Sequence, residues 1–196
     1  MAKNAGDLIL RDRMEFTLDS SGNRTTLYGR IDLSSFVSTI NREGLRIKQV
    51  MFQVREQNSG RLANTGIWDP IAVVDTPAGA VAGMKIYATT RAYENASDVG
   101  IASPDVLCVE EWTSNTSIGD GTDQGTSYWC TRDFYGPKDL HPEGYLVVSD
   151  LLIGVAVDDW LRNADSTLEI DVLLVAEPTK VTQDSMNEIL SQAQDL

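Results

Sequence analysis

Few residues in this sequence could perform acid–base chemistry, and they do not form a recognisable catalytic set. The single histidine, His141, stands directly before Pro142 and Glu143. Histidine is the most frequent general base, but no nucleophile in a strained turn accompanies this one, and a lone loop histidine is usually a solvated side chain. We therefore predict that the chain is not an enzyme, and we assign no catalytic residue.

Two pairs of adjacent carboxylates could suggest glycoside hydrolysis, which uses two acidic groups flanking the scissile bond. The pairs are Glu110 with Glu111 and Asp158 with Asp159. Adjacent residues on a strand point to opposite faces of the sheet, so Glu110 and Glu111 cannot share one site. A hydrolase whose acid pair comes from different strands is kept as a third hypothesis.

The two cysteines, Cys108 and Cys130, fall on neighbouring β-like segments. Two thiols and one histidine are too few ligands for a tetrahedral zinc site. We interpret them as two buried thiols. The alternative is a disulfide, within the chain or between subunits, with Cys108 and Cys130 as the candidates; it requires Cα atoms within about 7 Å of each other.

Two further patterns could bind a ligand. The loop at residues 119–123 carries two aspartates, but it lacks the glutamate that completes a calcium loop. We therefore predict a solvated loop tip, with no metal and no cofactor. The four tryptophans could line a sugar-binding face, although aromatic residues on strands more often lie in a core or an interface. They are Trp68, Trp112, Trp129 and Trp160.

The composition indicates one globular domain and argues against nucleic-acid binding. The chain has 196 residues, of which 42% are hydrophobic, as expected for one globular domain. It carries 29 acidic and 16 basic residues, a net charge of −13, and only 5 of the basic residues are lysines. Nucleic-acid binding needs a basic patch or arm, so we predict no direct contact with nucleic acid. The acidic excess suits either concentrated salt or an ordinary acidic protein.

The hydrophobic pattern predicts a chain made mostly of strands. Along residues 167–176, for example, Leu168, Ile170 and Val172 alternate with polar or outward residues, which is the period of a half-buried strand. A slip in this alternation between Ile47 and Val50 indicates a bulge. The eight predicted strands span residues 8–18, 25–33, 45–57, 82–92, 105–113, 127–135, 145–157 and 167–176.

Two helices are expected beside these strands. Residues 34–43 have a serine cap, three apolar residues on one face and a following Gly44, which predict a short helix. The tail predicts a second helix, with Ser185 and Glu188 as a capping box. We expect one jelly-roll domain over residues 1–179 and a helical tail over residues 180–196. The fold class is all-β, an antiparallel eight-stranded jelly-roll sandwich.

In this order of eight strands, with a short helix after the second strand and long loops, residues 7–178 resemble single jelly-roll viral coat proteins. The missing basic arm makes the chain more similar to capsid proteins of membrane-containing icosahedral viruses. The aspartate-rich, lysine-poor balance is similar to that of such viruses of halophilic archaea. The resemblance implies a capsid subunit that associates with copies of itself and with other capsid proteins, near an internal viral membrane, in a virion assembled in the host cytoplasm.

Assembly contacts are expected in the long or terminal segments at residues 58–70, 114–127 and 180–196. The alternative hypothesis is a β-sandwich carbohydrate-binding, lectin-like module that uses the aromatic residues. A glycan receptor is left open as a further partner.

Overall fold

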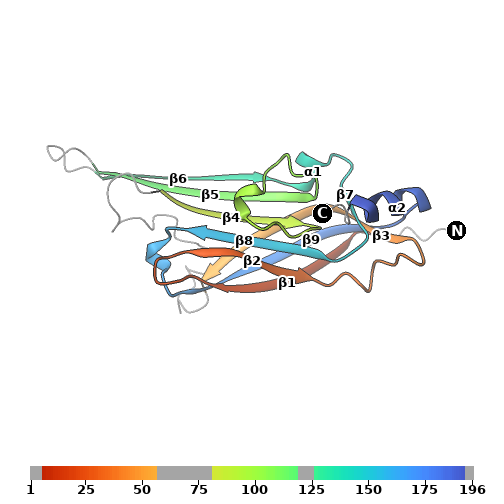
Figure 1. The fold of residues 1–196 in the computed structure, drawn as a ribbon, viewed down its shortest axis with the longest axis horizontal. Helices are drawn as coiled ribbons and strands as arrows, with labels where there is room; N and C mark the ends of the chain where they lie inside the picture. The colour runs from red at the N-terminus through yellow and green to blue at the C-terminus, as the bar shows by residue number, and fades with distance from the viewer. Residues whose placement is uncertain (1–5, 57–80, 119–125, 193–196) are drawn as a thin grey trace.

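The computed structural model describes residues 6–56, 81–118 and 126–192, and these form two antiparallel β-sheets packed face to face (Figure 1). The four-stranded sheet has the order β1 (Leu8–Thr17), β9 (Thr167–Lys180), β3 (Glu43–Glu56) and β7 (Tyr145–Val147). The five-stranded sheet has the order β2 (Arg24–Ile31), β8 (Leu151–Asp158), β4 (Val81–Thr89), β5 (Val106–Ile118) and β6 (Thr126–Tyr135).

The strand order is that of a jelly roll, which confirms the predicted fold class. The chain crosses from one sheet to the other between β1, β2, β3 and β4, and again between β7, β8 and β9. The first strand therefore pairs with the last, and the second with the last but one. This is the double Greek key of a jelly roll, and β6 is an additional strand at the edge of the five-stranded sheet.

Apolar residues at alternate positions fill the space between the sheets. On β9 the side chains of Leu168, Ile170, Val172 and Leu174 are buried, in the alternation that the sequence predicted. The bulge predicted on β3 is present, because the register with β9 shifts between Ile47 and Gln49. The apolar segment at residues 145–157 forms β7 and β8, in different sheets, with the break at residues 148–150.

The helix predicted at residues 34–43 is wrong. These residues form turns and an isolated bridge between Ser38 and Glu43. The Ser38 hydroxyl accepts a hydrogen bond from the Asn41 backbone N–H, and Arg42 has a positive φ of 53°. Such side-chain bonds offer the backbone an alternative to a helix. Of the predicted apolar face only Val37 packs against the core, since Phe36 is 38% and Ile40 92% exposed, so little packing would stabilise a helix here.

Two helices are found elsewhere. Helix α1 (Pro137–Leu140) lies between the predicted strands at 127–135 and 145–157, and its proline at the first position is a typical helix start. Helix α2 (Gln183–Gln192) confirms the predicted tail helix. Its cap is Thr182 rather than Ser185: the Thr182 hydroxyl accepts a hydrogen bond from the Ser185 backbone N–H.

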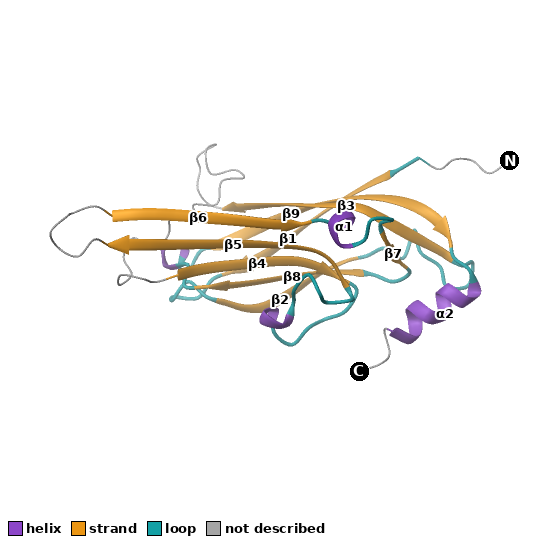
Figure 2. Cartoon of the chain, turned by 90° about the horizontal axis from the view of Figure 1, so that it is seen from above, coloured by secondary structure: helices purple, strands orange, loops and turns teal. Residues whose placement is uncertain are grey.

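Helix α2 lies at the end of the sandwich opposite the β5–β6 hairpin (Figure 2). Its Met186 is buried against Val148 and Val181. The division into a domain at residues 1–179 and a tail at residues 180–196 stays a prediction.

Candidate functional site

Strand β6 forms one edge of the five-stranded sheet, and within the described residues only β5 pairs with it. Its ten residues pair with β5 in unbroken register and include neither proline nor lysine. Edge strands usually carry such residues, or a bulge, to prevent pairing with another chain. The strand does carry two charged residues, Arg132 and Asp133, but its outer edge still offers a row of backbone donors and acceptors that no described residue pairs with.

The side chains of β6 add aromatic surface to that edge. Trp129 is 51% exposed, and Phe134 and Tyr135 are each 39% exposed. The register places Trp129 and Tyr135 on the outer face of the sheet, and Phe134 on the opposite face. We call the strand with these three side chains the β6 edge. Exposed aromatic residues are enriched at protein–protein contacts.

The β5–β6 hairpin extends past the rest of its sheet (Figure 1). The last β5 residue paired with β4 is Asn115, whereas the pairing with β6 continues to Ile118. The expected contact segment at 114–127 is therefore partly strand, and its residues 119–125 lie outside the described residues. The segment at 58–70, with Trp68, also lies outside them, as does the aspartate loop at 119–123.

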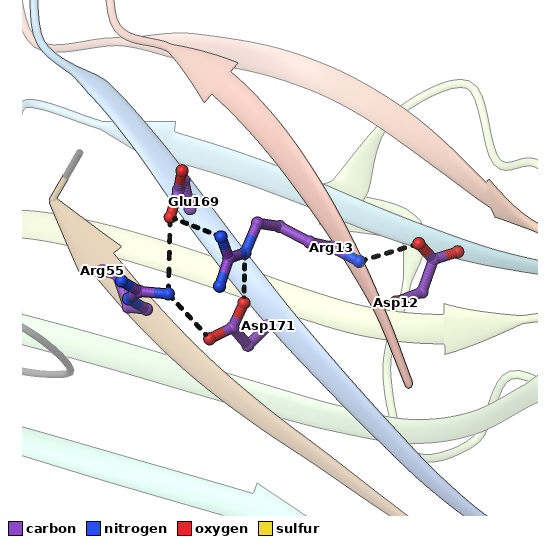
Figure 3. A network of polar contacts seen from close by, with 5 residues as sticks. All are labelled: Asp12, Arg13, Arg55, Glu169 and Asp171. Atoms are coloured by element: carbon purple, nitrogen blue, oxygen red, sulfur yellow. Dashed lines mark hydrogen bonds and ion pairs between the residues drawn. The ribbon is translucent and has the colours of Figure 1, made fainter. Parts of the chain in front are cut away.

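An ion-pair network covers the outer face of the four-stranded sheet (Figure 3). Arg13 Nε donates to Asp171 Oδ1 at 2.5 Å, and Arg55 Nη1 donates to Asp171 Oδ2 at 3.2 Å. Glu169 Oε2 lies 3.6 and 3.7 Å from the same two guanidinium groups. Burial acts to raise the pKa of Asp171, but the hydrogen bonds from Arg13 and Arg55 outweigh it and lower that pKa. The network ties three strands together.

The sequence interpretation missed this network because its members come from β1, β3 and β9. Alternation does assign Arg13, Arg55, Glu169 and Asp171 to outward positions. It does not reveal which outward residues of different strands become neighbours, because that depends on strand order.

The adjacent glutamates point to opposite faces, as predicted. Glu110 faces the inside of the sandwich, where its Oε1 accepts hydrogen bonds from Trp112 Nε1 at 2.7 Å and Arg132 Nε at 2.8 Å. Glu111 is on the outer face, 2.8 Å from Lys85 Nζ. The two carboxylates therefore serve separate ion pairs.

His141 has a structural contact rather than the solvated position expected from the sequence. It is half-buried at the C-terminal end of α1, and its Nε2 lies 3.1 Å from the carbonyl oxygen of Val106 on β5. Its ring meets that of Tyr145 edge-on, with 4.7 Å between the centroids. These contacts attach α1 to both sheets.

The cysteines are both free, and they lie far apart along the β5–β6 hairpin. Cys130 is opposite Ser114, six positions along β5 from Cys108. Cys108 is buried, and burial raises the pKa of its thiol. Cys130 is only half-buried, so the prediction of two buried thiols is confirmed for Cys108 alone. A bridge from Cys130 to another subunit stays a prediction.

The described tryptophans do not share one face. Trp160 is fully buried. Trp112 packs against the core, and Cζ of the Arg132 guanidinium lies over its ring, 5.1 Å from the ring centroid of Trp112. Trp129 is the exposed one. Within the described residues, no group of three or more histidines, cysteines or acids could hold a metal. No helix in that part of the chain has the length and apolar character to span a bilayer.

Solved structures to which this chain is similar are those of viral capsids. The decameric BFDV capsid protein has 11% identity and a TM-score of 0.35, covering 89% of this chain and 99% of that one. The 60-mer of the BFDV capsid protein has 11% identity and a TM-score of 0.35, covering 92% and 96%. Desmodium yellow mottle tymovirus has 9% identity and a TM-score of 0.31, covering 91% and 92%.

No protein-family model matches the sequence, and no curated protein matches it. Structural scores this low do not transfer a function, so a functional proposal has to rest on the residues of this chain.

Proposed function

We propose that this protein is a structural subunit that associates with copies of itself to build an icosahedral viral shell, without catalysis. The observation that carries the proposal is the β6 edge. It combines a strand edge that has no partner among the described residues with three exposed aromatic side chains, and monomeric proteins usually avoid both. A second copy of the chain satisfies the strand edge and buries the aromatic surface.

The use of the chemistry-bearing residues supports a structural role. His141 fastens α1, Glu110 holds Arg132 and Trp112, and Asp171 joins two arginines across three strands. Each of these groups has a partner within the protein that accounts for its position. A catalytic set requires a base free to meet a substrate and an oriented nucleophile, and the described residues hold no such arrangement.

The jelly roll is compatible with this role but does not select it, because the same fold serves capsid, lectin and cupin domains. The acidic charge keeps free subunits apart in dilute solution. It also opposes direct packing of a nucleic acid inside the shell. Self-association should therefore strengthen as salt screens the subunits from one another.

The test compares the wild-type chain with the variant Trp129→Thr. Sedimentation velocity measures the size of the assembled species over a concentration series, in low salt and in molar salt. We expect wild-type species to grow into defined capsomers or shells, visible by electron microscopy. Loss of a central aromatic contact should raise the concentration for half-assembly by about tenfold or more.

Ile101→Thr is the matched control, because Ile101 is 58% exposed and lies in a loop outside β6. It removes similar apolar surface and should leave assembly unchanged. A wild-type chain that stays monomeric under all these conditions contradicts the proposal. If that monomer is retained on a glycan array, the carbohydrate-binding alternative replaces it.

The finer part of the proposal concerns the kind of virus. The low lysine content and the acidic excess favour a shell that encloses a membrane vesicle in a halophilic archaeal virus. The subunit would then meet other capsid proteins and the vesicle surface within the virion. Electron microscopy of particles from the native source, with lipid analysis, tests this part separately.

A further inference from the structure

A cleft of about 960 Å³ lies between the two sheets, within the size range of small-molecule sites. One side is formed by the middle of β1, β9 and β3, where Val172, Phe52 and Val54 point inward. The other side is formed by Trp112 of β5 and its neighbours on β5 and β6. The walls are thus mostly apolar and partly aromatic.

An acidic residue sits among these inward-facing positions. Asp12 is opposite Val172, which is opposite Phe52, so the three share one row across the sheet. Asp12 is nevertheless exposed, because this row borders the cleft. Its carboxylate accepts a hydrogen bond from the Arg13 backbone N–H at 2.8 Å. No cationic side chain among the described residues pairs with it.

Arg11, Arg13 and Asp171 are also among the residues that border the cleft. Alternation directs their side chains to the outer face of the four-stranded sheet, where Arg13 and Asp171 bind each other (Figure 3). They do not neutralise Asp12 within the cleft.

The opposite wall presents a second carboxylate. Glu110 is 1% exposed, and its Oε1 already accepts two hydrogen bonds, from Trp112 and Arg132. Its Oε2 is buried and has no hydrogen-bond partner among the described residues. A buried, unsatisfied carboxylate oxygen is unfavourable. Glu110 lines the cleft, so a hydrogen-bond donor on a bound molecule can satisfy this oxygen.

We infer that this cleft binds a small molecule made of an apolar body and a protonated amine. The apolar walls accept the body. The inward-facing charged groups are two carboxylates and one guanidinium, an excess of one negative charge, so a cation is favoured over an anion. An ammonium group supplies the N–H donors that Asp12 and Glu110 Oε2 lack. The inference does not depend on the proposed function, because the cleft lies within a single chain.

The test uses octylamine as the probe, with octanol and octanoate as neutral and anionic molecules of matched length. Binding to the full chain is measured by calorimetry under conditions that keep the subunit dispersed, so the result is independent of assembly. We expect octylamine to bind more tightly than either comparison molecule. Asp12→Asn and Glu110→Gln should each weaken octylamine binding by about tenfold.

Glu111→Gln is the matched control, because Glu111 is adjacent in sequence but faces away from the cleft toward Lys85. It should bind octylamine like the wild type. Asp12 is exposed, so Asp12→Asn tests the inference even if Glu110→Gln fails to fold. Equal binding of the three probes, absence of octylamine binding, or an equal loss in Glu111→Gln overturns the inference.

Discussion

At the residue scale, Gly154 makes room for the buried ring of Tyr87. It lies on β8 directly between Tyr28 of β2 and Tyr87 of β4. The two hydroxyl groups meet above it at 2.6 Å, and the Tyr28 hydroxyl also accepts a hydrogen bond from the Tyr93 backbone N–H at 2.7 Å. Burial, followed by the bond to Tyr28, raises the pKa of Tyr87.

Gly154→Ala should therefore destabilise the fold. A Cβ atom at this position would lie 2.2 Å from Tyr87 Cζ, so the buried ring must move. Overpacking of this kind costs about 1–3 kcal/mol, and urea unfolding measures it. Gly83→Ala on β4 is the control, because its nearest contact is 3.9 Å away. Equal loss of stability in both variants would show that strand glycine itself, rather than the tyrosine ring, sets the requirement.

At the element scale, the strands could be predicted because the alternation of apolar and polar residues is a local pattern. Which strands lie side by side in a sheet could not be predicted, because that pattern carries no information on strand order. The pattern at residues 167–176 identified β9, yet nothing in it shows that β9 lies between β1 and β3. The same holds for β6, whose aromatic residues indicated a strand but not a sheet edge. The helix expected at 34–43 failed because Ser38 and Asn41 form a turn that the apolar spacing does not reveal. Sites that depend on strand order, such as the cleft, were therefore missed.

The network joining β1, β9 and β3 predicts a pH effect. Because the pKa of Asp171 is lowered in the folded state, its ionised carboxylate stabilises the fold at any pH above its unfolded-state pKa of about 3.9. This stabilisation is lost as the pH falls from there through the lower pKa of the folded state. Asp171→Asn should be less stable than wild type at pH 6, with the difference shrinking below about pH 4. Glu56→Gln, without an ion pair among the described residues, is the control. A difference independent of pH would contradict the role of the carboxylate.

At the scale of the whole molecule, two features oppose each other. The net charge of −13 repels copies of the chain, whereas the β6 edge is the surface through which we propose that they associate. Repulsion between exposed charges is screened by salt, while aromatic burial and strand pairing are not. Added salt should therefore both stabilise the folded subunit and strengthen the association between subunits.

This balance predicts that thermal stability rises with potassium chloride. The screening length falls from about 10 Å at 0.1 M to about 3 Å at 1 M, which weakens the repulsion within each subunit. The melting temperature, followed by circular dichroism, should rise between these concentrations. A variant with Glu94→Gln, Asp98→Asn and Asp133→Asn removes three negative charges at exposed positions, which changes the net charge from −13 to −10. Its melting temperature at 0.1 M salt should be higher than that of the wild type, and it should rise less between 0.1 M and 1 M salt. If both proteins gain equally, the effect comes from salting-out of apolar surface and not from charge, and the composition loses its argument for a halophilic source.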